Sequence, residues 1–265
     1  MSEQKIISIV NQKGGVGKTT TSVNLATALA AIYKKTLLID LDPQGNASTG
    51  LGIGSANRKK SIYNVIIGDL NINESIQKTT IENLDIIPAT VHLSAAEIDL
   101  INVEQREFQL KKNLAELTEK YDFIIIDCPP SLGILTINSL VASGSLIIPL
   151  QCEFFALEGL SYLLKTVSLI QKKLNPDLSI CGVVLTMYDK RNKLTEQVEQ
   201  DVRGCLGELV YKTVIPRNVR ISEAPSHGKP AIIYDLNCPG SIAYLHLAEE
   251  IIQQNEVSTC QSIKG

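Results

Sequence analysis

Residues 13–20 read Lys-Gly-Gly-Val-Gly-Lys-Thr-Thr, shortly after the apolar run Ile6–Val10 and before a stretch with helical periodicity. A glycine-rich turn between a buried strand and a helix, closed by a Lys-Thr pair, is typical of a phosphate-binding loop. Its glycines let backbone N–H groups converge on phosphate oxygens, and the helix adds the positive end of its dipole. A plain strand-to-helix turn is the alternative, which the Lys-Thr pair in register disfavours.

The residues of this loop have distinct expected roles. Lys18 bridges the outer phosphates of a bound nucleotide, and the Thr19 hydroxyl ligates Mg²⁺. Lys13 is surplus to the motif, because Lys18 already supplies the lysine that the loop requires. We therefore predict a Mg²⁺-dependent nucleotide site whose loop consists of Lys13, Gly14, Gly15, Val16, Gly17, Lys18, Thr19 and Thr20.

The rest of the chain alternates between short β-branched runs and segments with helical spacing. Runs that are apolar on both faces are typical of central strands in a parallel sheet. Leu25, Leu29 and Ile32 share one helical stripe between two such runs. The alternation predicts an α/β fold with a doubly wound, mostly parallel sheet flanked by helices. The expected strands are Ile6–Val10, Thr36–Leu41, Leu84–Ile87, Phe123–Asp127, Leu146–Pro149, Ser179–Leu185 and Lys212–Ile215.

The length of 265 residues and the apolar fraction of 44% suit one sizeable core. No low-complexity linker divides the chain, so we expect a single ATPase domain over residues 1–265. A last helix is expected over about Ser241–Gln254, followed by a flexible polar tail over about residues 255–265. The polar segment Gly54–Ser61 is expected to be a surface loop.

The composition of the chain indicates its cellular environment and the kinds of partner that it can bind. The chain has 25 basic and 28 acidic side chains, so a nucleic-acid site must be a local basic patch rather than the whole surface. The six cysteines form no C-x-x-C pair and suit a reducing cytosol. The longest apolar run, Ala28–Tyr33, has six residues, against about 20 needed to cross a bilayer.

Two further strands end in carboxylates. The strand Thr36–Leu41 leads into Asp42-Pro43-Gln44-Gly45-Asn46, and the strand Phe123–Asp127 ends in an aspartate. The carboxyl ends of parallel strands are where such folds bind ligands. Asp40 and Asp42 both leave the strand end, although Asp residues there are also ordinary turn formers.

The stretch Lys13–Thr20 resembles the deviant Walker A motif of the ParA/MinD family of ATPases, in which the extra lysine reaches across a dimer. The resemblance implies that Lys13 acts in an ATP-dependent homodimer, because a cation from the partner would cancel charge that develops during phosphoryl transfer. A solvated charge at the strand end is the alternative for Lys13. The catalytic residues that follow from the resemblance are Lys13, Lys18 and Asp42.

The carboxylate segments extend this resemblance. Phe123–Ser131 resembles a Walker B strand, which implies that Asp127 holds Mg²⁺ through water. The D-x-D-P-Q-G-N segment implies that Asp42 positions or activates the attacking water and that Asp40 helps to organise the water shell of the metal. Pro129–Pro130 is expected to be a rigid segment near the γ-phosphate that reports its presence.

Segments late in the chain look like the chromosomal ParA/Soj branch of this family, so the resemblance covers nearly the whole chain. They are Thr186–Asp189, Ile215–Arg220 and Ser222–Pro230. The branch implies an ATP-bound sandwich dimer that binds double-stranded DNA without sequence preference. It also implies weak basal ATPase activity that a ParB-type partner stimulates, and a cytoplasmic, nucleoid-associated location.

The late segments supply candidate contacts to DNA and to adenine. The resemblance favours Arg191 and Arg220 as DNA-contacting residues, and dimerisation would double their number and steeply raise affinity. Arg191 belongs to a basic cluster with Lys190 and Lys193, for which a solvated basic loop is the alternative. Met187 and the Pro216-Arg217-Asn218 turn follow successive strands near the expected base pocket, so they are candidates to read the adenine edge. They are equally compatible with plain strand-to-helix turns.

The residues of the chain also argue against three other functions. A membrane-recruited regulator like the MinD branch would carry a basic amphipathic C-terminal helix. This end of the chain has Glu249, Glu250 and Glu256 and only Lys264 as a base, so we expect no stable membrane association. A carrier of metal clusters would need paired cysteines, whereas Cys128 stands alone and is expected to be a small buried apolar residue. An inert nucleotide-binding adaptor is hard to reconcile with the complete set of loop and strand-end residues.

Overall fold

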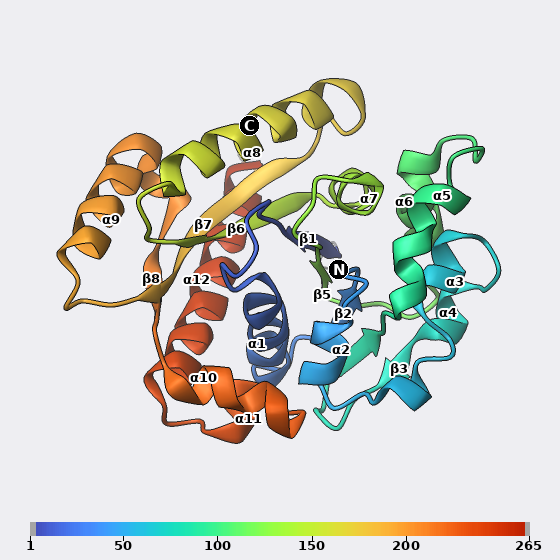
Figure 1. The fold of residues 1–265 in the computed structure, drawn as a ribbon, viewed down its shortest axis with the longest axis horizontal. Helices are drawn as coiled ribbons and strands as arrows, with labels where there is room; N and C mark the ends of the chain where they lie inside the picture. Colours follow the sequence, from blue (N-terminus) through green and yellow to red (C-terminus); the bar gives the residue numbers. More distant parts are fainter. Residues whose placement is uncertain (1–3, 263–265) are drawn as a thin grey trace.

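Within residues 4–262, whose backbone the computed structural model describes, the chain forms an eight-stranded sheet (Figure 1). Side chains are described for residues 4–254. The strands lie in the order β3-β4-β2-β5-β1-β6-β7-β8, and each neighbouring pair is parallel except β3 with β4. The strand bounds are β1 Lys5–Ile9, β2 Thr36–Asp40, β3 Gln77–Lys78, β4 Leu84–Ile87, β5 Phe123–Asp127, β6 Ser145–Gln151, β7 Ser179–Tyr188 and β8 Val210–Pro216.

The predicted α/β fold with a mostly parallel sheet is confirmed. Each of the seven predicted runs forms a parallel strand. The pattern missed β3, a two-residue antiparallel strand that is too short to show periodicity.

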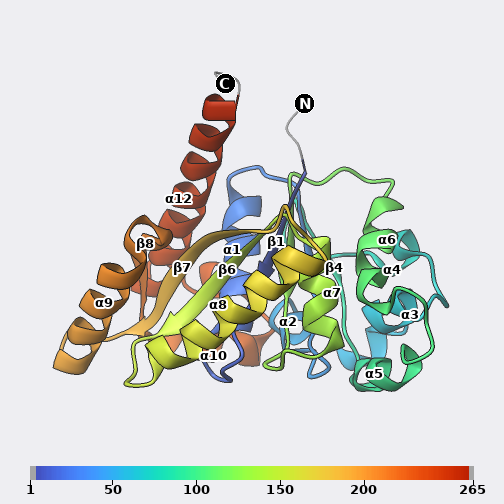
Figure 2. The same cartoon turned by 90° about the horizontal axis from the view of Figure 1, so that it is seen from above.

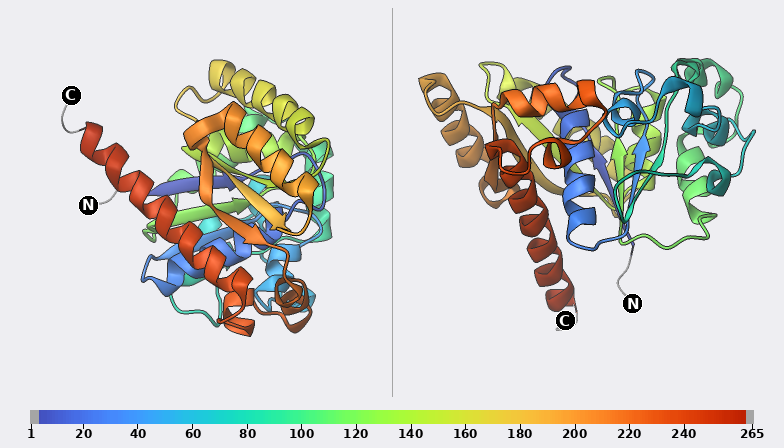
Figure 3. Two further views of the ribbon diagram at one scale, coloured as in Figure 1. Left: turned by 90° about the vertical axis from the view of Figure 1, so that its left-hand side faces the viewer. Right: turned by 90° about the horizontal axis from the view of Figure 1, so that it is seen from below.

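Helices cover both faces of the sheet (Figure 2). α1 and α12 pack on one face through residues such as Leu29 and Leu247, whereas α7 and α8 pack on the other through Leu140 and Leu163. Figure 3 shows these layers from two further sides. The helix bounds are α1 Lys18–Ala31, α2 Asn46–Gly50, α3 Ile62–Ile66, α4 Ile72–Ser75, α5 Ala96–Asp99, α6 Gln109–Ala115, α7 Ile134–Ala142, α8 Ala156–Lys173, α9 Lys193–Leu206, α10 Val219–Glu223, α11 Ala231–Tyr234 and α12 Pro239–Ser262.

The central strands contribute to both cores, because successive side chains of a strand point to opposite faces. Leu37 and Ile39 of β2 belong to the core under α7 and α8, whereas Leu38 belongs to the core under α1 and α12. This explains why the strands read as unbroken apolar runs in the sequence.

The last helix is longer than predicted, because α12 continues past Gln254 to Ser262. It is tied to the edge strand, since the Glu250 carboxylate accepts hydrogen bonds from the backbone N–H groups of Lys212 (2.7 Å) and Thr213 (3.0 Å) on β8. The predicted tail over about residues 255–265 lies outside the residues whose side chains are described, and its flexibility stays a prediction. The assignment of residues 1–265 to one domain also stays a prediction.

No helix within residues 4–262 combines the length and the apolar character that crossing a membrane requires.

The carboxyl ends of three central strands meet at one edge of the sheet. β5 lies between β1 and β2, and the register pairs Asp127 with Ile9 on one side and with Asp40 on the other. After β1 the chain crosses β5 to reach β2, whereas after β5 it crosses β1 to reach β6. The connections diverge here, and α/β sheets bind their ligands at such switch points.

Candidate nucleotide-binding site

The glycine-rich loop follows β1 at this switch point and opens α1. Gly15 and Gly17 have φ values of 76° and 85°, in the left-handed region that side chains other than glycine rarely adopt. A Cβ on Gly14 or Gly15 would meet nothing within 4 Å, so the loop borders open space. The Thr186 hydroxyl donates to the Val16 carbonyl (2.8 Å) and holds the loop against the end of β7. The loop therefore has the backbone shape and the room that a phosphate group needs.

The two lysines of the loop lie in different environments. Lys18 is 7% exposed, and its ammonium donates to the backbone carbonyl of Lys13 (2.9 Å). Burial lowers the pKa of Lys18, and the negative charge of Asp127 opposes this effect. The Lys13 side chain is 45% exposed and forms an ion pair with Glu153, which lies between β6 and α8. One lysine thus faces the interior of the site and the other its surface.

Two buried carboxylates lie side by side at the strand ends. Asp127 and Asp40 are register partners on β5 and β2, and both side chains are fully buried. Ser22 of α1 donates to Asp127 Oδ1 (2.7 Å), and the Ser48 hydroxyl (2.6 Å) and backbone N–H (2.7 Å) both donate to Asp40 Oδ2. Burial raises the pKa of Asp127, and the negative charge of Asp40 raises it further. Burial also raises the pKa of Asp40. The pair therefore favours a nearby cation.

The residues present fit a Mg²⁺ ion bound together with a nucleotide. Among the described side chains, the buried oxygen that lacks a hydrogen-bond partner is Asp127 Oδ2. Thr19 lies in the first turn of α1, the helix from which Ser22 donates to Asp127 Oδ1. The described residues contain no group of three or more His, Cys, Asp or Glu side chains placed to hold a metal ion. Magnesium in such sites needs fewer, because it keeps several waters and takes phosphate oxygens as ligands.

Asp42 is positioned by the turn that follows β2. Its Oδ1 accepts a hydrogen bond from the backbone N–H of Gln44 (2.9 Å), and its backbone carbonyl accepts one from Gly45 (2.9 Å). The residue is 7% exposed. Asp42 therefore forms the turn that the sequence allowed and also lies close to the buried carboxylate pair, since its backbone N–H donates to Asp40 Oδ1 (3.3 Å).

Arg58 is a residue that the sequence analysis missed. It lies in the segment Gly54–Ser61, predicted as a surface loop, yet it is 8% exposed. Its guanidinium donates to the Gly45 carbonyl (3.0 Å), to the Thr49 hydroxyl (2.8 Å) and to the Ile53 carbonyl (2.6 Å from Nη2, 3.0 Å from Nε). Arg58 therefore supports the turn that carries Asp42 and the helix α2 behind it. No sequence pattern predicts that such an arginine is buried, because most of its acceptors are backbone groups.

Three of the four candidate adenine residues line a cavity of about 720 Å³ at the ends of β7 and β8, and the fourth, Met187, precedes Tyr188, which also lines it. Pro216, Arg217 and Asn218 line it, and the Arg217 N–H donates to the Tyr188 carbonyl (3.0 Å). Met187 lies between this cavity and the loop, since a Cβ on Gly17 would be 4.0 Å from Met187 Cε. Met187 has a φ of 51°, an uncommon conformation for its type. Met187 therefore lies beside the loop, and the Pro216-Arg217-Asn218 turn lies beside the next residue along the chain, Tyr188.

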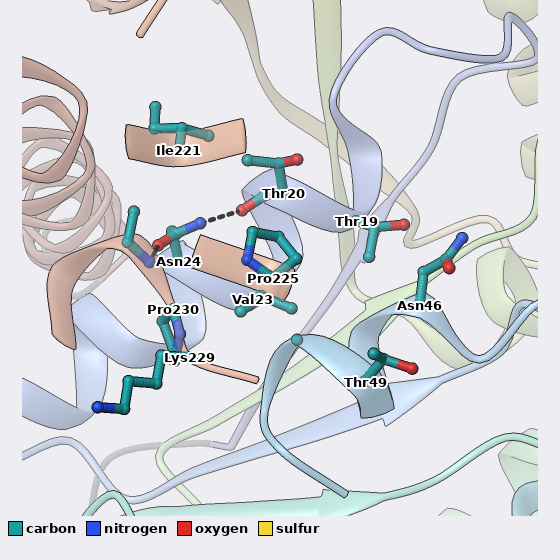
Figure 4. Close-up of a pocket in the computed structure, with 12 residues that line it drawn as sticks. Thr19, Thr20, Val23, Asn24, Asn46, Thr49, Ile221, Pro225, Lys229 and Pro230 are labelled. Atoms are coloured by element: carbon teal, nitrogen blue, oxygen red, sulfur yellow. Dashed lines mark hydrogen bonds between the residues drawn. The ribbon is translucent and has the colours of Figure 1, made fainter. Parts of the chain in front are cut away.

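A second cavity, of about 280 Å³, lies beside the start of α1 (Figure 4). Thr19, Thr20 and Asn24 of α1 form one wall, and Ile221 and Pro225 belong to the opposite segment. The Asn24 side chain spans the two, because it donates to the Thr20 carbonyl (2.8 Å) and accepts from the backbone N–H of Ala231 (2.8 Å). The cavity thus places α10 next to the helix that the loop opens.

The two candidate DNA-contacting arginines lie near the same edge of the sheet. Arg191 lines the larger cavity together with Lys190 and Arg217, and Arg220 is on α10, which begins at its rim with Val219. The segments after β7 and β8 therefore come together at one edge of the sheet. Each arginine is paired within the chain, Arg191 with Asp189 (2.8 Å) and Arg220 with Glu223 (3.0 Å).

Cys128 is buried as predicted, and its thiol donates to the Ser139 hydroxyl (2.9 Å). Burial raises its pKa to about 12, so the thiol stays protonated and unreactive near neutral pH.

The chain is similar over nearly its whole length to known partitioning proteins. Residues 4–180 match a family model described as an AAA domain. The chain is 58% identical to the sporulation initiation inhibitor protein Soj of Bacillus subtilis, over 93% of this chain and 98% of that protein. It is 53% identical to the chromosome partitioning protein ParA of Caulobacter vibrioides, over 94% of each.

Two solved structures have the same fold. Cobyrinic acid a,c-diamide synthase from Mycobacterium smegmatis with bound ADP and magnesium has a TM-score of 0.84 and 35% identity, over 96% of each chain. The septum site-determining protein MinD from Pyrococcus horikoshii, complexed with Mg-ADP, has a TM-score of 0.77 and 30% identity, over 96% of this chain and 98% of that one. Both proteins hold ADP together with magnesium.

The support that Arg58 gives to the turn can be tested by unfolding in urea. Arg58→Ala removes both donors of the Ile53 carbonyl and one of the donors of the Gly45 carbonyl, so we expect the free energy of unfolding to fall by about 1–3 kcal/mol. Lys59→Ala removes an exposed cation next to it and should change the free energy by less than about 0.5 kcal/mol. Equal effects of the two substitutions would contradict the role of Arg58.

Proposed function

Because the chain belongs to the ParA/Soj family of chromosome-partitioning ATPases, we propose that ATP acts in it as an assembly signal. ATP binding brings two copies together through their nucleotide sites, and the dimer binds DNA without sequence preference. Slow hydrolysis, stimulated by a ParB-type partner, separates the copies and releases the DNA. The protein is then cytoplasmic and associated with the nucleoid while it holds ATP.

The observation that carries this proposal is the different placement of the two loop lysines. Lys18 is buried beside Asp127 and is placed to serve the phosphates of its own nucleotide. Lys13 is half-exposed at the surface of the site, where a phosphate of a second subunit can approach it. A cation that enters from the partner adds charge where the transition state needs it, and the complete site then exists only in the dimer.

The remaining site residues have separate roles in hydrolysis. The backbone N–H groups of Gly14–Thr20 and the start of α1 hold the phosphates. Thr19 and Asp127 would hold Mg²⁺, with Asp40 ordering its water shell, and the bound ion would neutralise phosphate charge. Asp42 accepts a proton from the attacking water or orients it. Hydrogen bonds from Gln44 to the Asp42 carboxylate and from Arg58 to the Gly45 carbonyl hold this turn. The carboxylate therefore needs no rearrangement during the reaction.

The adenine base is assigned to the space between Met187 and the Pro216-Arg217-Asn218 turn. The left-handed backbone of Met187 supports this assignment, because strained conformations concentrate at ligand sites. Backbone groups at this turn are suited to reading the edge of a base. The thioether and the proline ring offer apolar surfaces to its faces.

DNA binding is assigned to Arg191 and Arg220. Their ion pairs with Asp189 and Glu223 are exposed, and exposed pairs contribute little to stability, so phosphates can displace the carboxylates easily. A monomer presents a few such contacts on an acidic protein. A dimer presents twice as many on one surface, and affinity for DNA rises steeply with their number.

A membrane-recruited regulator of the MinD type is the second candidate, and the structure of the C-terminal helix disfavours it. In α12, Glu250 is bound to β8, and Ile251 is fully buried. The described part of this helix is therefore committed to the core of the protein. An amphipathic membrane anchor must instead leave its apolar face available to lipid.

The proposal predicts a trapped dimer when the water-positioning carboxylate is removed. Asp42→Ala should bind ATP, form a dimer that retains DNA, and lower the hydrolysis rate by at least about 100-fold, since proton transfer from water is impaired. Light scattering with ADP and with ATP, with and without DNA, gives the mass, and phosphate release gives the rate. Asp177→Ala, at an exposed acid in the turn before β7, is the control. An Asp42→Ala protein that hydrolyses ATP at the parent rate would show that the role is misplaced.

The assignment of the DNA contacts predicts a change in salt dependence. Arg191→Ala or Arg220→Ala should weaken DNA binding by the ATP-bound dimer and lower the slope of log affinity against log salt by about 1–2, because each dimer loses two phosphate contacts. The dimer mass should not change. Lys172→Ala, an exposed base in the last turn of α8, should leave both quantities unchanged. An unaltered slope in both arginine variants places the DNA site elsewhere.

A further inference from the structure

An exposed pair of aromatic residues stands next to the half-exposed lysine of the loop. Phe154 and Phe155 are 75% and 65% exposed, and their rings meet edge to face with centroids 5.0 Å apart. They lie in the connection between β6 and α8, directly after Glu153, the ion-pair partner of Lys13. Large aromatic rings in water are costly to maintain, and a paired cluster of them is typical of a contact surface.

The aromatic pair is held in place from the protein side. Ala156 and Leu160 of α8 are buried, which fixes the first turn of this helix against the sheet. The Gln12 side chain donates to the Gly159 carbonyl (3.2 Å), and the Ala156 N–H donates to the Glu153 carbonyl (2.9 Å). The rings therefore project from an anchored segment rather than from a loose loop.

The same contacts connect the aromatic pair to the nucleotide loop. β6 is the neighbour of β1 in the sheet, so the connection after β6 and the loop after β1 lie at the same edge (Figure 2). Lys13 contacts this connection at Glu153, and Gln12 contacts the first turn of α8 at Gly159. When Lys13 turns to a phosphate of another subunit it leaves Glu153, so nucleotide-driven movement of the lysine acts directly beside the rings.

We propose that Phe154 and Phe155 are the apolar anchors through which a second copy of this chain docks in the ATP-bound dimer. The inference rests on the proposed function, because it assigns the contact surface of the same dimer. The patch can match its own charges across a two-fold axis, since it carries the cation Lys13 and the carboxylates of Glu153 and Glu158 around its apolar centre. In a two-fold contact each Lys13 meets the other subunit's phosphate or carboxylate, while the rings bury one another.

The charges around the patch favour a protein occupant over a lipid surface. Glu153 and the exposed Glu158 flank the rings, and anionic headgroups would be repelled by both carboxylates. The aromatic pair is also continuous with the loop that the dimer must enclose.

The test uses the hydrolysis-deficient Asp42→Ala protein as the parent, so that the dimer persists during measurement. Phe154→Ser with Phe155→Ser in this parent should weaken dimerisation in Mg-ATP by about 100-fold, measured by sedimentation over a range of concentrations, because four rings leave one interface. The matched control is Leu169→Ser in the same parent. Leu169 is 57% exposed and lies on the same helix, about 20 Å further along. This control should dimerise like the parent.

The outcomes distinguish a failure of the proposed function from a failure of this inference alone. Thermal unfolding and the ATP dissociation constant of the double Phe variant should match those of the parent, which excludes a folding or nucleotide-binding defect. A parent that stays monomeric with ATP overturns the proposed function and this inference with it. A parent that dimerises beside a double Phe variant that dimerises equally well overturns the inference alone. The same holds if the variant keeps its dimer but loses stimulation by the ParB-type partner, because the rings would then belong to that partner's site.

Discussion

The parallel register of β1, β5 and β2 is the constraint on which the site depends. It places the glycine-rich loop, Asp127 and Asp40 at one edge, and it buries two carboxylates side by side. Charges held so close in the interior are unfavourable unless cations join them. The protein itself supplies Lys18, and a metal bound with a nucleotide would supply the rest. A Mg²⁺ ion beside Asp127 would offset the repulsion between the two carboxylates.

Contacts around the glycine-rich loop explain how nucleotide binding can be coupled to the assembly of the dimer. Lys18 donates to the carbonyl of Lys13, so a movement of one lysine toward phosphate disturbs the other. Lys13 holds Glu153, which precedes the exposed aromatic pair. On the other side, the cavity beside α1 brings α10 and its Arg220 next to the start of that helix. The loop therefore contacts the surface assigned to the second subunit and shares a cavity with the element assigned to DNA.

The sequence predicted the sheet well because central parallel strands are apolar on both faces and leave unbroken runs. It also predicted that the loop and the aspartates meet, since residues that follow parallel strands share one edge. It could not predict Arg58 inside, because a polar segment looks exposed and the acceptors of this arginine are mostly backbone groups. The pairing of Lys13 with Glu153 was equally hidden, because side chains far apart in the chain leave no periodic signal. The two-residue strand β3 was too short to recognise.

The central claim is that Lys13 acts on the nucleotide of the other subunit, and mixing two inactive proteins tests it most directly. Lys13→Ala keeps its own Asp42 but supplies no lysine, whereas Asp42→Ala supplies Lys13 but cannot hydrolyse its own ATP. A mixed dimer then has one complete site. The account predicts that an equal mixture in Mg-ATP regains about a quarter of the wild-type hydrolysis rate, since half of randomly formed dimers are mixed and each has one complete site of two. A mixture that hydrolyses ATP no faster than the sum of its separate components would contradict the account.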